Sequence, residues 1–408
     1  MAELDASKLI ITPTRSPKAV PAPNSPEVWS QNCTSDHMLT VRWTAKSGWE
    51  APEIRPYGPL SLLPTASVLH YATECFEGMK AYRGVDGRVR LFRPDRNAKR
   101  FLQSAARISL PQFGPDEFVK LLKRFVGIEA ARWIPEPGRF IYIRPTMIAT
   151  APALGMQKPK EALLYIITAM FPSLDEPTAV ISPAAPPNGT TTNGTANGAQ
   201  HEGPGPKASK GMRLLASRHD IIRAWPGGFG NAKVGANYGP SLLAQGEAKE
   251  RGYDQVLWLF GDECYVTEAG GSNFFVLWKR RDTGRLELVT APLGDGIILA
   301  GVTRASVLEL VKKNMPEIDV VERTFTMQEI IAAEQEERLL EAFGAGTAFF
   351  IAPCSDIHFR GVDVEFPLAK SGVDAAQGAR YALEIKRLLK DVMYGRVQHE
   401  WGVVVEEE

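Results

Sequence analysis

The chain has 408 residues, more than one ordinary domain holds, so two domains are expected. Hydrophobic residues make up 44% of it and charged residues 23%, as in ordinary globular proteins, and no apolar run approaches the roughly 18 residues of a membrane helix. Lysine plus arginine and aspartate plus glutamate number 47 each, and the resulting zero net charge gives no indication of nucleic acid or an anionic membrane as partner.

Residues 1–28 are predicted to form an extended, proline-rich lead-in. They contain no apolar core of a secretory signal, and Glu3 and Asp5 are unlike the acid-poor transit peptides. The four cysteines of the chain show no CxxC spacing, which argues against a disulfide framework or a zinc site. We therefore expect a cytoplasmic rather than a mitochondrial protein, without a bound metal.

Residues 29–171 are expected to form a small N-terminal α/β domain. Residues 95–108 have helical periodicity, whereas 140–148 and 162–170 are rich in the β-branched and aromatic residues that favour strands. The next segment, 172–211, holds seven prolines and six glycines, too little apolar surface to offset the entropy of ordering it. It is predicted to be a flexible insertion between two domains.

Residues 212–408 are expected to form a larger C-terminal domain. Its predicted strands lie at 255–260, 273–278 and 286–290, and its helices run from Pro240 to about Arg251, after Thr303, and after the capping box Thr326-x-x-Glu329. Strands and helices mixed in both halves indicate a two-domain α+β or α/β protein.

The densest chemical signal is GGFGNAKVGANYGPS, residues 227–241. A phosphate-binding P-loop would need glycine before Lys233 and serine or threonine after it, but Ala232 and Val234 stand there. On composition alone a solvated lysine in a glycine-rich turn would be the expected outcome. The third interpretation is a lysine that forms an imine, which needs partial desolvation and a cofactor close to the backbone; the apolar neighbours and the glycines suit both needs.

The stretch resembles the cofactor-lysine segment of the branched-chain amino acid aminotransferases, class IV of the enzymes that depend on pyridoxal 5′-phosphate (PLP). Further segments resemble that family in the same order, from about residue 28 to about residue 401, and they lie at 35–43, 48–84, 90–94, 142–145, 255–278 and 341–348. The resemblance implies a fold-type IV enzyme, similar to D-amino acid aminotransferase, with PLP as a Schiff base on Lys233.

The resemblance also implies the residues that hold the cofactor. Glu268 would pair with the pyridine nitrogen, Tyr238 would hydrogen-bond the phenolic oxygen, and Arg100 would bind the phosphate. The backbone at Val302 and Thr303, where a helix is expected to start, would provide further phosphate contacts, and Thr347 would add another anchor.

Strand alternation separates Tyr142 and Arg144 from Ile141 and Ile143. The resemblance implies that the polar face lines the substrate site. The same site would contain Tyr71 and the backbone N–H groups of Thr347 and Ala348 for the α-carboxylate, with Phe76 in the apolar side-chain pocket. It would lie at a homodimer interface, where Leu154 and Met156 reach toward the partner's site.

The sequence departs from the family pattern at four places. Thr34 replaces an aromatic residue, Gly271 replaces a threonine, and a Gly-x-Tyr element after the strand at 162–170 is missing. The CxxC of some members is absent, with Phe349 and Ala352 at those places. The first three departures alter the pocket that selects the side chain.

The resemblance therefore implies transamination between leucine, isoleucine or valine and 2-oxoglutarate. An aminotransferase with a changed hydrophobic donor, used in specialised biosynthesis, is the alternative. A same-fold lyase related to aminodeoxychorismate lyase and a non-catalytic protein that keeps the fold also remain open.

Overall fold

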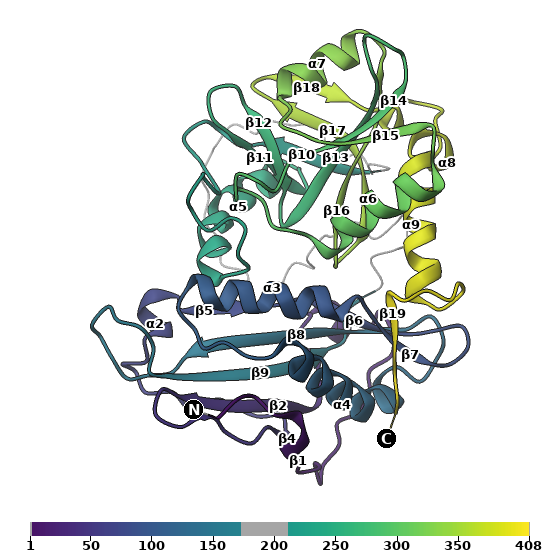
Figure 1. The fold of residues 1–408 in the computed structure, drawn as a ribbon. Helices are drawn as coiled ribbons and strands as arrows, with labels where there is room; N and C mark the ends of the chain where they lie inside the picture. The colour runs from purple at the N-terminus through teal and green to yellow at the C-terminus, as the bar shows by residue number, and fades with distance from the viewer. Residues whose placement is uncertain (1, 173–210, 408) are drawn as a thin grey trace, which may run out of the picture.

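The computed structural model describes residues 2–172 and 211–407, which are built around one β-sheet in each half of the chain (Figure 1). The predicted insertion at 172–211 therefore lies almost wholly outside the described residues. Among those that are described, no helix is long and apolar enough to cross a membrane. No group of three or more histidine, cysteine, aspartate and glutamate side chains in this part of the chain could hold a metal ion.

The first sheet has ten strands in the described residues, in the order β1–β4–β2–β9–β8–β6–β7–β19, with β3 beside β2 and β5 beside β8. Their bounds are β1 Ile10–Ile11, β2 Thr34–Thr44, β3 Gly48–Trp49, β4 Glu53–Pro56, β5 Glu74–Phe76, β6 Met79–Arg83, β7 Val89–Phe92, β8 Phe140–Ala149, β9 Glu161–Ala169 and β19 Gly402–Val405. The helices of this half are α1 Pro26–Trp29, α2 Val68–Tyr71, α3 Pro94–Arg107 and α4 Pro115–Trp133.

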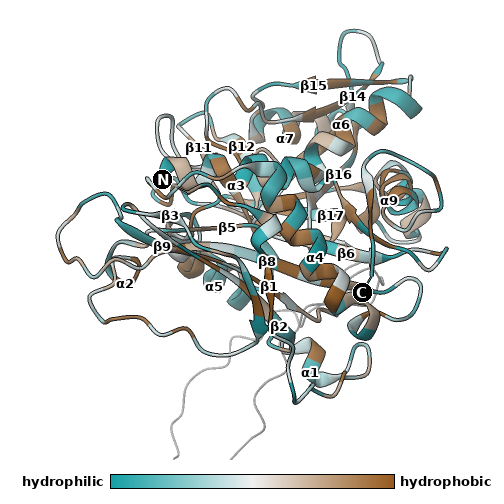
Figure 2. Ribbon diagram, turned by 60° about the horizontal axis from the view of Figure 1, so that its bottom comes forward, coloured by the Kyte–Doolittle hydropathy of each residue, from teal (hydrophilic) through white to brown (hydrophobic). Residues whose placement is uncertain are grey.

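Helices α3 and α4 share one apolar core with the sheet. Phe101 of α3 and Phe118 and Phe125 of α4 are fully buried there, together with Ile141 and Ile143 of β8. Hydrophobic and hydrophilic stretches alternate along both helices (Figure 2), as expected where only one face meets a core. The predicted helix at 95–108 and the strands at 140–148 and 162–170 are confirmed within a residue or two.

The second sheet has nine strands in the described residues, ordered β12–β11–β10–β17–β16–β13–β14–β15, with β18 beside β17. Because β12 also pairs with β13, six of the strands close into a barrel, and its interior holds buried Leu214, Leu257 and Phe274. The bounds are β10 Met212–Ala216, β11 Gln255–Phe260, β12 Tyr265–Ala269, β13 Ser272–Lys279, β14 Leu286–Thr290, β15 Ile318–Glu322, β16 Leu339–Gly346, β17 Phe350–Phe359 and β18 Val362–Glu365.

The helices of the second half are α5 Leu242–Glu250, α6 Val302–Asn314, α7 Met327–Gln335, α8 Ala375–Gly378 and α9 Arg380–Met393. The capping box is present as predicted, with Thr326 and Glu329 bonding each other's backbone N–H. The helix expected from Pro240 begins with a 3₁₀ turn, Gly239–Ser241, and α5 then runs to Glu250, followed by Gly252 at φ 81°.

The end of the chain returns to the first sheet, although residues 212–408 were expected to form one C-terminal domain. After α9 the chain crosses to β7, and β19 pairs antiparallel with it (Figure 1). Glu407 then forms a two-pronged ion pair with the buried Arg83, at 2.5 and 2.6 Å. A strict division at the insertion therefore does not describe the sheets.

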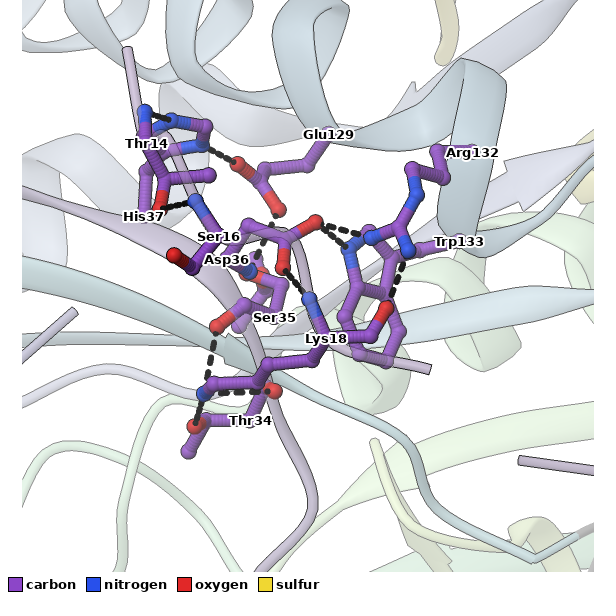
Figure 3. Close-up of polar contacts among 11 residues, drawn as sticks. Thr14, Ser16, Lys18, Thr34, Ser35, Asp36, His37, Glu129, Arg132 and Trp133 are labelled. Atoms are coloured by element: carbon purple, nitrogen blue, oxygen red, sulfur yellow. Dashed lines mark hydrogen bonds and ion pairs between the residues drawn. The ribbon is translucent and has the colours of Figure 1, made fainter. Parts of the chain in front are cut away.

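The N-terminal residues are integrated into the fold and do not simply lead into it. Strand β1 pairs with β4, and Leu4 and Val28 are buried in the core of the first half. Residues 14–18 lie along β2 and α4, held by a polar clamp whose centre is Asp36 and His37 (Figure 3). The residue pattern of the N-terminal segment did not predict that it packs against β2 and α4. The contacts that hold it are hydrogen bonds between segments far apart in sequence, which a local pattern does not reveal.

Candidate active site

The glycine-rich stretch is anchored on the first half of the molecule. Ala232 and Val234 are buried in the core that α3 and α4 form with the first sheet. Between them, the backbone N–H of Lys233 donates to Oγ of Ser104 at 2.8 Å, and the Lys233 carbonyl accepts from the N–H of Phe76 at 3.0 Å. The backbone on both sides of the lysine is therefore fixed.

The amine of Lys233 faces two aromatic side chains. Its Nζ lies 3.1 Å from the hydroxyl oxygen of Tyr238 and 4.8 Å from the ring centroid of Phe76. The two rings are 5.0 Å apart. Asn237 donates to the carbonyls of Phe229 and Ala232 at 2.7 Å each and so closes the loop that carries Tyr238.

Arg100 is buried at the boundary of the two halves. Its Nε and Nη2 each lie 2.7 Å from an oxygen of Glu77, and its Nη1 donates to the carbonyl of Ala300 at 3.1 Å. Burial alone would lower the pKa of the Arg100 guanidinium, but the paired Glu77 more than offsets this, so the pKa is raised. Ala300 lies two residues before Val302, so the guanidinium faces the N-terminus of α6.

Glu268 lies on β12 with its carboxylate fully buried. Its Oε1 accepts from Nδ2 of Asn273 at 3.2 Å and from the N–H of Leu299 at 3.3 Å, whereas Oε2 is 2.5 Å from Nη1 of Arg223 but accepts no aligned hydrogen bond. Burial raises the pKa of Glu268 despite the opposing charges of Arg223, Lys233 and Arg100. Because the charges of Lys233 and Arg100 both act on Glu268, these three predicted residues lie near one another.

The polar face of β8 is turned toward this space. Nη2 of Arg144 donates to the hydroxyl of Tyr142 at 2.7 Å, and the guanidinium lies 4.7 Å from the ring centroid of Phe76. Ile141 and Ile143 are fully buried on the other face, so the predicted alternation is confirmed. The Tyr142 ring stacks on Phe171 at 4.4 Å.

The turn between β16 and β17 borders the same face. Oγ1 of Thr347 donates to the carbonyl of Gly78 at 3.2 Å, and Ala348 is exposed. Gly78 is close to Tyr142, because a Cβ placed on it would lie 2.4 Å from the tyrosine hydroxyl. The structure thus brings Thr347, Tyr142 and Arg144 into one neighbourhood.

Tyr71, Leu154 and Met156 lie elsewhere. Tyr71 is 42% exposed, and its hydroxyl donates to the carbonyl of Leu154. Leu154 and Met156 are 58% and 89% exposed. In the described part of the chain these three residues form an exposed edge, and the substrate-site role of Tyr71 stays a prediction.

Five contributors were missed by sequence reasoning: Glu77, Lys80, Ser104, Arg223 and Asn273. Glu77 follows Phe76 in the family-like segment 48–84, so the sequence alone could have marked it as a candidate site residue. Asn273 faces Glu268 across the β12–β13 hairpin, five residues away. Lys80, Ser104 and Arg223 contact the site through partners distant in sequence, which periodicity cannot reveal.

Two departures from the family pattern can be located. Gly271 is exposed, and a Cβ built on it would meet no atom within 4 Å, so the space of the expected threonine is left open. Thr34 is bound through its hydroxyl by Nζ of Lys18 at 2.8 Å (Figure 3).

Comparisons with known proteins agree with this arrangement. The sequence model of the family described as amino-transferase class IV matches residues 74–357. The cytosolic branched-chain-amino-acid aminotransferase of Mus musculus is 42% identical over 402 residues, covering 98% of this chain and 92% of its own. The cytosolic and mitochondrial enzymes of Saccharomyces cerevisiae are also 42% identical, each over 99% of this chain and over 98% and 94% of their own.

Solved structures show the same fold. The branched-chain aminotransferase of Thermoproteus uzoniensis with norvaline has a TM-score of 0.62 and 22% identity, covering 90% of this chain and 99% of its own. The branched-chain amino acid aminotransferase of Thermobaculum terrenum, in its PLP form, also has a TM-score of 0.62 and 22% identity, covering 90% of this chain and 98% of its own.

Proposed function

Because the chain belongs to the class IV aminotransferases, we propose that it transfers amino groups between a branched-chain L-amino acid and 2-oxoglutarate, with PLP held at Lys233. The observation that carries the proposal is the group formed by Lys233, Tyr238, Arg100 and Glu268, which come from three separate segments and lie close enough for their charges to act on one another. The 42% identity to enzymes named for this reaction supports leucine, isoleucine and valine as donors.

The residues present fit the cofactor. Oε2 of Glu268 is buried beside Arg223 but accepts no aligned hydrogen bond, so it would accept one from a protonated pyridine nitrogen. Glu77 and Ala300 occupy three of the five N–H groups of Arg100, which leaves two for a phosphate near the N-terminus of α6 at Val302 and Thr303. Thr347 would be a further phosphate contact.

When bound, PLP supplies a ring that accepts electrons from the substrate Cα. Lys233 would hold the cofactor through its amine and, once displaced, would carry the proton between Cα and the cofactor carbon. The Tyr238 hydroxyl, 3.1 Å from Nζ, would orient that amine and bond the phenolic oxygen.

The substrate would lie against β8 and the turn that follows β16. Arg144, Tyr142 and the backbone N–H groups of Thr347 and Ala348 would hold the α-carboxylate, and Phe76 would contact the side chain. Arg144 is fixed by Tyr142 and by the Phe76 ring, so its charge is oriented before substrate enters.

Tyr71 shares the exposed edge of Leu154 and Met156, and we assign all three to the contact with a second copy of the chain. Large exposed apolar side chains that follow one another on a loop are typical of an interface. A homodimer in the cytoplasm is the proposed form; the yeast relatives include both cytosolic and mitochondrial enzymes.

A larger hydrophobic donor is the second candidate. By resemblance to the family, both positions would border the side-chain pocket. The open space at Gly271 and the engagement of Thr34 by Lys18 would then leave that pocket without a wall that the family usually has. Such a pocket would reduce the discrimination between leucine and bulkier amino acids by the modest factors typical of apolar pockets.

The test is a screen of amino donors with the purified enzyme and 2-oxoglutarate, followed through the absorbance of the cofactor and the glutamate formed. Turnover of leucine, isoleucine and valine supports the proposal. Turnover of another hydrophobic donor, with none of these three, would support the second candidate, and pyruvate release without an amino acceptor would identify a lyase.

A further inference from the structure

Lys80 carries a buried ammonium group beside the proposed active site. It lies on β6, its residue is only 4% exposed, and its Nζ donates to the carbonyl of Ala348 at 2.9 Å. The rings of Phe140 and Phe350 flank the ammonium, with centroids 4.1 and 4.6 Å from Nζ. Burying a charge is costly, and the two rings and the carbonyl offset part of that cost.

The carbonyl that Lys80 binds belongs to the turn between β16 and β17. Phe350 ends this turn with a φ of 59°, a left-handed conformation that is unfavourable for a buried aromatic residue and must be held by its surroundings. Lys80 contacts the turn at two points, through the carbonyl of Ala348 at its middle and the face of Phe350 at its end.

A second contact fixes the turn to the same strand. Thr347 donates to the carbonyl of Gly78, two residues before Lys80. Strand β6 in turn pairs with β8, where Lys80 lies opposite Tyr142. One strand pair therefore supports both the turn, from the second half of the chain, and the polar side chains of the proposed substrate site.

We propose that Lys80 is a positioning residue that holds the Ala348 turn in place and adds positive charge where the substrate α-carboxylate binds. The inference rests on the proposed function. Because the charge is buried, its effect on a nearby anion is screened less than that of a surface lysine. Lys80 would therefore strengthen the binding of carboxylates and leave uncharged parts of the substrate unaffected.

The test compares two ligands of the PLP-loaded enzyme: 4-methylvalerate, which has a carboxylate, and 3-methylbutylamine, which has none. Lys80→Gln keeps a hydrogen-bond donor but removes the charge, and is expected to weaken 4-methylvalerate about tenfold and to change the amine less than about twofold. Lys99→Gln, at a side chain that is 73% exposed on α3, is the control and should change neither ligand.

Equal weakening of both ligands, or of neither, would overturn the proposal, since a general loss of structure would affect the amine as well. If Lys80→Gln does not fold, Lys80→Arg keeps the charge but displaces the donor to Ala348, so it tests the hold on the turn alone, and a smaller but still selective weakening of the carboxylate is expected. Neither ligand is a substrate of the full reaction, so a wild type that binds 4-methylvalerate but fails to transaminate leucine would refute the proposed donor and not the role of Lys80.

Discussion

The backbone N–H of Lys233 donates to Oγ of Ser104, and the same hydroxyl donates to the carbonyl of Arg100 one turn earlier on α3. A fully buried serine thus joins the lysine that would hold the cofactor to the helix that carries the proposed phosphate ligand. One hydroxyl therefore links the backbone of Lys233 directly to the backbone of Arg100.

Ser104→Ala is expected to leave the Lys233 N–H unpaired and to cost about 1–3 kcal/mol of stability. The turnover of leucine should fall because the amine is less well placed, and the amount of bound cofactor should fall less. Unfolding in urea, turnover and cofactor content would be measured together. Gln103→Ala, next to it on α3, is the control, and equal effects from both variants would contradict the role of Ser104.

The raised pKa of Glu268 leads us to expect that the free energy of unfolding of the cofactor-free protein depends on pH. Burial raises its pKa, so the folded chain binds more protons than the unfolded chain in the window above the ordinary value of about 4.3. Its contribution to stability is present below that value and is lost as the pH rises through the folded pKa. Glu268→Gln should remove this part of the decline, measured by urea unfolding between about pH 4 and 8, with Glu263→Gln in an exposed turn as the control.

The pair Arg100–Glu77 is expected to behave as a buried ion pair. Glu77→Gln leaves the guanidinium without its countercharge and should lower the free energy of unfolding by about 3–5 kcal/mol. Glu309→Gln is the matched control, since Glu309 also bonds arginines of the first half, Arg93 and Arg96, but is partly exposed, and it should cost less than about 1 kcal/mol. Similar losses in the two variants would show that burial of the pair is unimportant.

The contacts of Asp36 lead us to expect that this residue controls the release of residues 14–18 from β2 and α4. Its carboxylate accepts from the Lys18 N–H at 2.7 Å and from Trp133 at 3.0 Å, and it pairs with Arg132 (Figure 3). Asp36→Asn replaces one acceptor oxygen by a donor, so the segment should detach more often.

Limited trypsin digestion after Arg15 and Lys18 measures this release, and the variant should be cut several-fold faster than the wild type. Asp5→Asn is the control, because Asp5 caps a short helix outside the clamp. Unchanged cleavage in Asp36→Asn would mean that β1 and the buried Leu4 and Val28 hold the segment without the clamp.

Much of the fold follows from local patterns. The capping box at Thr326, the strand at 286–290 and the alternation of Tyr142 with Ile141 depend on neighbours a few residues away, and each was predicted correctly. The candidate residues Lys233 and Tyr238 lie five positions apart in one motif, and their contact at 3.1 Å agrees with their proposed roles.

The remainder depends on contacts between distant segments. Arg223 reaches Glu268, Lys80 reaches Ala348 and β19 reaches β7, and no periodicity links the members of these pairs. Tyr71 shows that a recognised motif does not give a residue's surroundings. Its exposed position beside Leu154 could be seen only in the three-dimensional structure.

The return of β19 to the first sheet has a consequence for synthesis. About 310 residues separate β7 from the strand that covers its edge, and at ordinary translation speeds their synthesis takes on the order of 15–60 s. During that time β7 can pair with β6 but its other edge stays open, and an open edge strand is a template for pairing with other chains. Pairing with β19 thus closes an edge of the first sheet that would otherwise stay open.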